Sequence, residues 1–349
     1  MSRKVLAAGP VAWMVKPRVI AVVVIAAVLL VLVAAINIGM GSSRIGIWNV
    51  LETLLGGGTR RERGIIFDLR LPRTLAGVLV GAALGLSGAL FQSVARNPLA
   101  SPDILGITWG AGVGAVTAIV AGGYRGQVSG MVSALGVPVA GLIGGLLAGV
   151  LLYALSWRRG IDGYRMVLIG IGLWAISYNI VNWLLAAGDV NDAARATTWL
   201  VGNLADVGWD SVGPVAIALA VLVPITLVCG RTVGGLQFGD DTARGLGIRV
   251  DGARGALLLL AAALAAIATA AAGPITFVAL ATPQIAVRLA KTAQPPLVGS
   301  MVLGALLTVG ADLLTRLLLP DLPVGVLTAI LGAPYLIFLF VRSRREARA

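Results

Sequence analysis

The sequence contains no histidine and a single cysteine, Cys229, among its 349 residues. The absence of histidine removes the usual general base and the most frequent zinc and haem ligand. A lone cysteine excludes an intramolecular disulfide framework and a thiolate metal cluster. We therefore expect no metal site and no cofactor in this chain.

Charged residues are also scarce, at 12% of the sequence, whereas soluble domains carry about 25%. The lysines, Lys4, Lys16 and Lys291, lie outside any G-x-x-x-x-G-K-[ST] phosphate loop, so we expect no ATP binding or hydrolysis by this chain. We also expect it not to be an enzyme, because no paired carboxylates remain for chemistry. The net charge of +12 indicates membrane orientation rather than nucleic-acid binding, because no basic block is interleaved with aromatic residues.

Apolar residues, by contrast, make up 58% of the chain and form long uncharged runs. A run of about 20 such residues spans a bilayer as a helix. The pattern predicts an all-α polytopic membrane protein with a single transmembrane domain over residues 1–349. The predicted spans, about ten in number, are Val19–Ile38, Thr74–Ala95, Ile104–Gly122, Met131–Trp157, Met166–Ala187, Ser211–Gly230, Gly255–Ala272, Pro274–Ala290, Pro295–Leu318 and Leu322–Val341.

Two of these runs need separate arguments. Val19–Ile38 is longer than the apolar core of about 7–15 residues in a cleaved signal peptide, so we expect it to be retained as a span. Gly255–Val287 is too long for one crossing of a hydrocarbon core about 30 Å thick. Gly273-Pro274 lies inside it and should break the helix, which gives two spans, the second of them short.

The distribution of basic residues predicts the orientation. Most of the 27 lysines and arginines lie on one side of the predicted spans, which places both termini in the cytoplasm. This gives a cytoplasmic N-terminal segment 1–18, spans between 19 and 341, and a cytoplasmic tail 342–349. The inner segment 231–254 should contain short helices. The outer loop Gly39–Arg73 carries arginines against this bias, which suggests a role of its own.

Several motifs follow one another in a fixed order. Gly77, Gly81 and Gly85 recur every four residues in the second predicted span, and this spacing of small residues favours close helix packing. Asp312 and Arg316 are four residues apart, so they can pair on one helix face. The ordered motifs are Arg70-Leu71-Pro72-Arg73, Arg96-Asn97-Pro98-Leu99, the segment from Gly239 to Ile248, the segment from Gly273 to Gln284, and the segment from Leu322 to Pro334.

Together these motifs resemble the permease subunits of ABC importers for iron–siderophore, haem and vitamin B12 uptake, the FecCD family. The resemblance covers roughly Arg70 to Val341. It implies a type II importer in the bacterial cytoplasmic (inner) membrane, with a second permease subunit (identical or paralogous), ABC ATPase subunits and an extracytoplasmic substrate-binding protein as partners. It also implies a ferric siderophore as the cargo. Haem and vitamin B12 are the alternatives. Many members carry histidine after the second proline of the 273–284 motif, whereas this chain has Gln284, which occurs in siderophore-type members.

The resemblance also assigns roles on the cytoplasmic side. The chemistry of the 239–247 segment alone allows either a solvated loop or a short helix capped by Asp240 or Asp241. The resemblance assigns Asn97 and Leu99 to a cytoplasmic gate, and a simple turn is the alternative interpretation. It assigns Gly163 and Tyr164 to the second element of this gate, where the sequence matches the family less well. The family's ATPase-coupling helices correspond here to Gly239, Asp240, Asp241, Thr242, Ala243, Arg244, Gly245, Leu246 and Gly247.

On the outer side, the resemblance assigns Arg70, Arg73 and Arg316 to docking of the binding protein, and contact with lipid phosphates is the alternative. Asn179, Asn182 and Gln284 are candidates for lining the pathway, and hydrogen bonds between helices are the alternative for them. A secondary transporter that works alone would need ionisable groups inside the spans. Asp312 is the only carboxylate within a predicted span, and it has an arginine partner, which disfavours that class.

Overall fold

The computed structural model describes residues 4–8, 11–15, 17–41, 45–122, 130–158, 160–319 and 322–346. Each predicted span contains one helix. Among the described residues, seven helices are long and apolar enough to cross a membrane, and three apolar helices are shorter. The prediction of an all-α polytopic protein is thus confirmed. The helices that lie in the predicted spans are α1 (Pro17–Gly39), α4 (Leu71–Ala95), α5 (Ile107–Gly122), α6 (Gly130–Ser156), α7 (Gly163–Ala187), α9 (Trp209–Val228), α12 (Val250–Ala272), α13 (Val278–Ala290), α14 (Leu297–Leu318) and α15 (Val324–Glu346).

Short helices and two strands lie at the two ends of the bundle. The predicted N-terminal segment lies partly outside the described residues, and its described part is an antiparallel hairpin that the sequence did not suggest. Short helices inside 231–254 were predicted and are present. The short elements are β1 (Lys4–Ala8), β2 (Val11–Val15), α2 (Ile47–Leu54), α3 (Arg60–Arg63), a π-helical turn (Gly64–Arg70), α8 (Val190–Leu200), α10 (Gly230–Leu236) and α11 (Asp240–Gly245).

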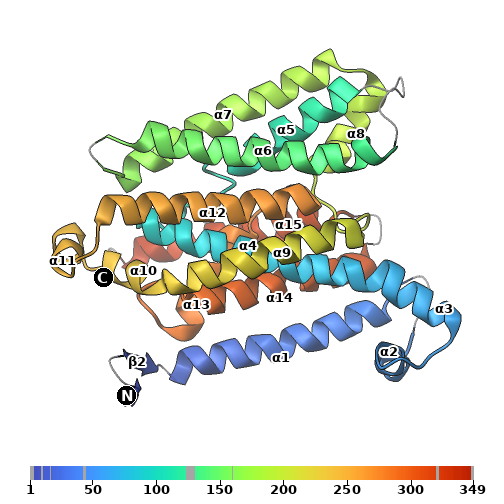
Figure 1. Ribbon diagram of the computed structural model, residues 1–349, viewed down its shortest axis with the longest axis horizontal. Coiled ribbons are helices and arrows are strands. Elements are labelled where there is room, and N and C mark those ends of the chain that lie inside the picture. Colours follow the sequence, from blue (N-terminus) through green and yellow to red (C-terminus); the bar gives the residue numbers. More distant parts are fainter. Residues whose placement is uncertain are drawn as a thin grey trace.

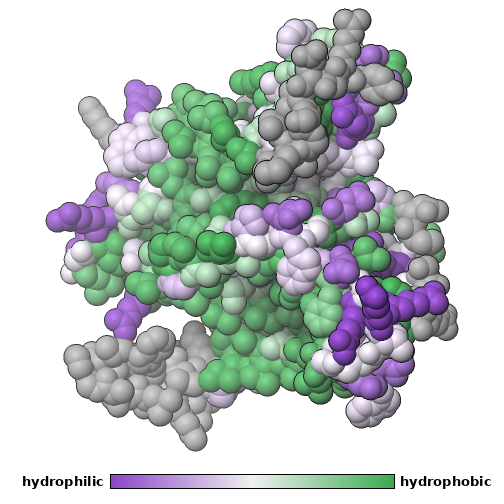
Figure 2. Space-filling model, turned by 45° about the vertical axis from the view of Figure 1, so that its right-hand side comes forward, coloured by the Kyte–Doolittle hydropathy of each residue, from purple (hydrophilic) through white to green (hydrophobic). Residues whose placement is uncertain are grey.

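The helices are arranged in layers around α4 (Figure 1). Helices α5 to α8 form one layer, α1 lies on the opposite flank, and α4 packs between them against α12, α13 and α14. Helix α11 lies at one end of the bundle with both termini, whereas α2 and α3 lie at the other end. Hydrophobic side chains cover much of the middle of the face in Figure 2, and many hydrophilic ones lie toward its edges, as expected for a bundle that crosses a bilayer.

The glycines of α4 allow direct contact between helix backbones. A Cβ atom added at Gly81 would meet the carbonyl oxygen of Gly304 in α14, and one added at Gly85 would meet that of Ser300. Gly88 lies equally close to the carbonyl of Ala279 in α13. The prediction that these small residues serve helix packing is therefore confirmed.

The prediction that Gly39–Arg73 is a loop is wrong, because the segment contains α2, α3 and the π-helical turn. Helix α3 is capped by a reciprocal pair between Thr59 and Glu62, and it continues through the π-helical turn into α4, so that one apolar helix extends over Arg60–Ala95. Pro72 lies just after the π-helical turn, and the helix continues through it. The charges from Arg60 to Arg70 therefore belong to this helix.

The predicted break at Gly273-Pro274 is confirmed. Helix α12 ends at Ala272, and α13 begins at Val278 after five non-helical residues. Another segment supplies a hydrogen-bond partner for the backbone at this break, since the N–H of Asn203 donates to the carbonyl of Ala272 at 2.8 Å. Irregular backbone at membrane depth is tolerated where protein surrounds it.

The α4–α14 contact generates a test on two glycines. Gly85→Ala should destabilise the protein, because overpacking by a methyl group typically costs about 1–3 kcal/mol and exceeds the gain in helix propensity. Gly310→Ala in α14 is the matched control, because a Cβ atom at Gly310 meets nothing within 4 Å. Thermal unfolding in detergent measures both variants. Equal melting temperatures would contradict the importance of this backbone contact.

Candidate functional site

Helix α11 presents one exposed and one buried face at its end of the bundle. Asp241, Arg244 and Leu246 are exposed, with Leu246 at 64%, whereas Ala243 is fully buried. The helix ends at Gly245, and Gly247 follows with a φ of +81°, as expected for residues that stop a helix. The remaining predicted residues follow this division: Gly239 and Asp240 are half-buried, and Thr242, Gly245 and Gly247 are exposed.

The predicted aspartate cap of α11 is wrong, because Asp240 is engaged in ion pairs instead. Neither aspartate caps the helix, which begins after Gly239. Arg254 in α12 forms a bidentate pair with Asp240 at 2.8 and 3.0 Å, and Arg96 at the end of α4 pairs with it at 2.7 Å. Burial acts to raise the pKa of Asp240, but Arg254 and Arg96 outweigh it and hold this pKa below its ordinary value. We call Arg96, Asp240 and Arg254 the Asp240 cluster.

The two predicted gate elements lie against each other beside this cluster. Asn97 accepts a hydrogen bond from the N–H of Leu99 at 2.9 Å, which closes the turn after α4. Gly163 at the start of α7 packs on the carbonyl of Ala95, and no Cβ atom would fit there. Tyr164 is 75% exposed. The structure thus brings together two segments that are more than sixty residues apart in the chain.

A polar cavity of about 330 Å³ opens next to the 97–100 turn. Gln284 in α13 donates to the side-chain oxygen of Gln92 in α4 at 2.6 Å, and both residues line the cavity. Gln284 therefore forms the hydrogen bond between helices that was its alternative interpretation. Because it also lines the cavity, its role in the pathway stays a prediction. Arg96 and Asn97 also line this cavity.

Asn179 and Asn182 lie elsewhere, on an exposed face of α7. Their side-chain amides donate to carbonyls of the same helix, those of Ala175 and Tyr178, at 2.8 and 2.9 Å. The hydrogen bonds between helices that the sequence left open are not formed by these donors. The exposed face also carries Trp183, which is 67% exposed.

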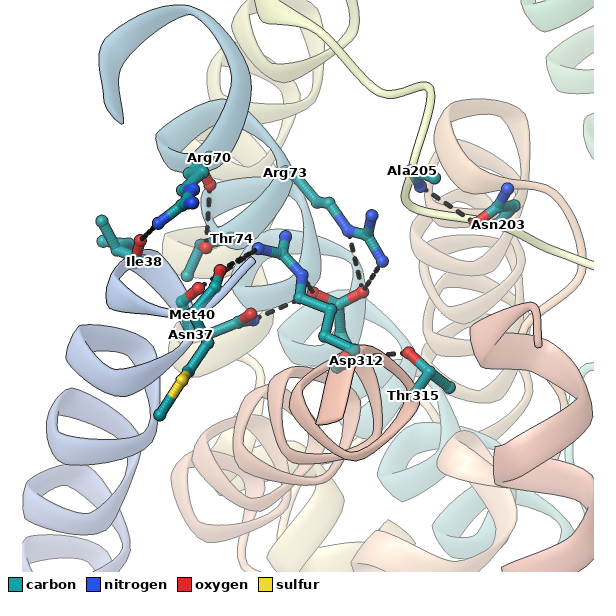
Figure 3. A network of polar contacts seen from close by, with 11 residues as sticks. Asn37, Ile38, Met40, Arg70, Arg73, Thr74, Asn203, Ala205, Asp312 and Thr315 are labelled. Carbon is teal, nitrogen blue, oxygen red and sulfur yellow. Dashed lines mark hydrogen bonds and ion pairs between the residues drawn. The ribbon is translucent and has the colours of Figure 1, made fainter. Parts of the chain in front are cut away.

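At the opposite end of the bundle, a buried carboxylate gathers several donors (Figure 3). Asp312 is 1% exposed and accepts from Arg73 at 2.9 Å and from Asn37 at 2.9 Å. The Nε atom of Arg316 lies 3.1 Å from the Oδ2 atom of Asp312, so the predicted ion pair on α14 is confirmed. We call Asn37, Arg73, Asp312 and Arg316 the Asp312 cluster. Asn37 was missed, although it is the one polar side chain in the run Val19–Ile38.

The predicted docking arginines differ in exposure. Arg70 is 6% exposed and donates to the carbonyls of Ile38 and Gly39 at the end of α1, at 2.9 and 3.0 Å. The side chain of Arg316 is 10% exposed, and that of Arg73 is 21% exposed. The arginines therefore tie α1, α4 and α14 together, and Arg73 is the most accessible of them.

Among the described residues, no group of three or more Cys, Asp and Glu side chains is placed to hold a metal ion. Apolar spans, an exposed helix with a half-buried ion cluster at one end, and a buried ion cluster at the other end define a polytopic membrane protein of the transporter class. The model of the FecCD transport family matches residues 28–342, and the chain belongs to this family.

Individual relatives agree with this assignment. The chain is 38% identical to the ferric enterobactin transport system permease protein FepG of Escherichia coli, over 85% of this chain and 88% of that protein. It is 34% identical to the iron(3+)-hydroxamate import system permease protein FhuG of Bacillus subtilis, over 90% and 95%. A solved inward-facing structure of a metal-chelate type ABC transporter superposes with a TM-score of 0.80 at 26% identity, over 92% of this chain and 99% of that one.

The Asp312 cluster generates a stability test. Asp312→Asn keeps the shape of the side chain but leaves Arg73 and Arg316 without their counter-charge, which should lower the free energy of unfolding by about 3 kcal/mol. Asp192→Asn is the control, because Asp192 is nearly as buried but pairs with Arg195, whose side chain is 56% exposed. Unfolding in mixed micelles compares the two variants. A loss no larger for Asp312→Asn than for Asp192→Asn would contradict the prediction.

Proposed function

We propose that this chain is the transmembrane permease subunit of a type II ABC importer that carries a ferric siderophore into the cytoplasm. The observation that carries the proposal is membership of the FecCD family over residues 28–342. Relatives named for ferric enterobactin and for iron(3+)-hydroxamate support the class of cargo. Gln284, at the position described above, is consistent with it.

A separate ATPase subunit supplies the energy in this proposal. Helix α11 supports this, because its exposed residues Asp241 and Arg244, with Leu246 directly after the helix, offer a compact surface for docking. The end of the bundle that carries α11 then faces the cytoplasm. Both chain termini lie at that end, which agrees with the positive-inside expectation for an inner-membrane protein (Figure 1).

The substrate-binding protein docks at the opposite end, near the Asp312 cluster. Arg73 offers the most accessible guanidinium among the three arginines there. Arg70 and Arg316 are more buried and connect the neighbouring helices to each other. A second permease subunit covers the exposed face of α7 across the pathway. The amides of Asn179 and Asn182 support this placement, because polar groups on an exposed membrane helix favour a partner or a water-filled pathway over lipid.

Purification and reconstitution test the function. Purified from its native membrane in mild detergent, the chain should bring an ATPase and a second permease with it. In proteoliposomes, this complex should take up an iron-loaded siderophore only with ATP and the binding protein. Uptake of haem or vitamin B12 instead would change the cargo. Transport by this chain alone, driven by an ion gradient, would overturn the proposal in favour of a secondary transporter.

Docking of the binding protein tests the role of Arg73. Arg73→Gln removes the charge but keeps a donor for Asp312, and it should weaken docking about tenfold, equivalent to about 1.4 kcal/mol. Arg61→Gln is the control, because Arg61 is exposed in α3 at the same end of the bundle and outside the Asp312 cluster. Surface plasmon resonance with the reconstituted complex measures both affinities, and copurification of the ATPase should be unaffected. Equal affinities would remove Arg73 from the docking surface.

A further inference from the structure

We infer that Asp240 is the carboxylate through which α11 positions both turns at its end of the bundle, so that movement of α11 reaches them together. The inference rests on the proposed function, because it concerns how ATPase docking is passed to the pathway. Asp240 acts as a positioning residue, since it holds Arg96 and Arg254 rather than the cargo.

Helix α11 has few attachments to the rest of the protein. Within the described part of the chain it packs mainly on α10 and α12, and the buried methyl group of Ala243 is its main apolar anchor. Asp240 adds its charged attachments. A force applied to the exposed face of α11 therefore reaches the bundle through a small set of contacts, and the ion pairs of Asp240 are the directional ones.

The first connection runs from Asp240 to the turn after α4. Arg96 ends α4 in the left-handed region, with a φ of +50°, which is unusual for an arginine. Its guanidinium donates to Asp240 at 2.7 Å and to the carbonyl of Leu236 at 2.6 Å, so both contacts help to fix this backbone. Asn97 follows directly, and therefore the residue that Asp240 holds lies immediately before the 97–100 turn.

The second connection runs from Asp240 to the turn before α7. Arg254 is buried in the first turns of α12, and one of its nitrogens donates both to Asp240 at 3.0 Å and to the carbonyl of Ile161 at 2.9 Å. Ile161 lies two residues before Gly163, which packs on the carbonyl of Ala95. The contacts thus form a closed ring that returns to the end of α4.

Loss of the Asp240 charge would leave two guanidinium groups without their shared partner. Arg254 has little room to find another one, because it is buried and its Nε has no hydrogen-bond partner. A buried charge that loses its partner is costly, so the side chain has to move and release Ile161. Both turns would then be detached from α11 while the exposed docking face of α11 remains in place.

The test compares Asp240→Asn with Asp251→Asn in the reconstituted complex. Asp251 lies in the first turn of α12 at the same end of the bundle, but it forms no ion pair with Arg96 or Arg254 in the described structure. We expect Asp240→Asn to assemble and hydrolyse ATP but to move about tenfold less iron–siderophore per ATP, within the usual range of coupling between sites. Asp251→Asn should keep the ratio of the natural chain.

A second readout separates coupling from folding. With Cys229→Ser as background, Leu99→Cys reports how accessible the 97–100 turn is to a thiol reagent. The labelling rate should change on ATP binding in the natural chain and in Asp251→Asn, but not in Asp240→Asn. Asp240→Glu, which keeps the charge, should restore the response.

The outcomes distinguish this inference from the proposed function. An unchanged transport ratio and an ATP-dependent labelling rate in Asp240→Asn would overturn the role of Asp240 while leaving the importer intact. If Asp240→Asn fails to assemble, Arg96→Gln decides, because it removes only one connection: a lost labelling response supports the inference, and a retained one overturns it. If the natural complex itself moves no siderophore, the proposed function fails, and the inference fails with it.

Discussion

The contact between the backbones of α4 and α14 is the constraint on which the rest of the structure depends. Glycines on α4 bring the two helices so close that their carbonyls replace side chains in the interface. This approach aligns Arg73 near the start of α4 with Asp312 on α14. It also fixes the far end of α4, where Arg96 meets Asp240. One close-packed helix therefore sets the position of both ion clusters.

The bilayer explains why the Asp312 cluster and the irregular segment between α12 and α13 are embedded in protein. A charge or a free backbone group is expensive in hydrocarbon, so each must find a partner within the chain. Asp312 accepts hydrogen bonds from Asn37 and Arg73 and forms an ion pair with Arg316. The break between α12 and α13 is covered by the 202–203 segment and by Gly325. Close packing of the helices is thus also what brings buried polar groups to their hydrogen-bond and ion-pair partners.

Much of this fold could be predicted from the sequence, because apolar runs and small-residue spacing are local signals. The spans, the break at Gly273-Pro274 and the Asp312–Arg316 pair follow from residues near each other in the chain. The continuation of α3 into α4 was missed, because the charges and Pro72 before Arg73 are typical of a loop. The pairing of Asp240 with Arg96 was also missed, since these residues are 144 positions apart and no local pattern encodes their contact.

The position of the two clusters on α4 has a mechanical consequence. Helix α4 contains 25 residues and is therefore about 37 Å long, with Arg73 in its first turn and Arg96 directly after its last. Backbone contacts with α14 and α13 prevent it from bending or sliding easily, because close-packed interfaces repack rather than deform. In the proposed importer, events at either end of the bundle reach the other as a movement of α4 together with α14. In our inference, the Asp240 cluster determines whether the 97–100 and 161–164 turns follow that movement.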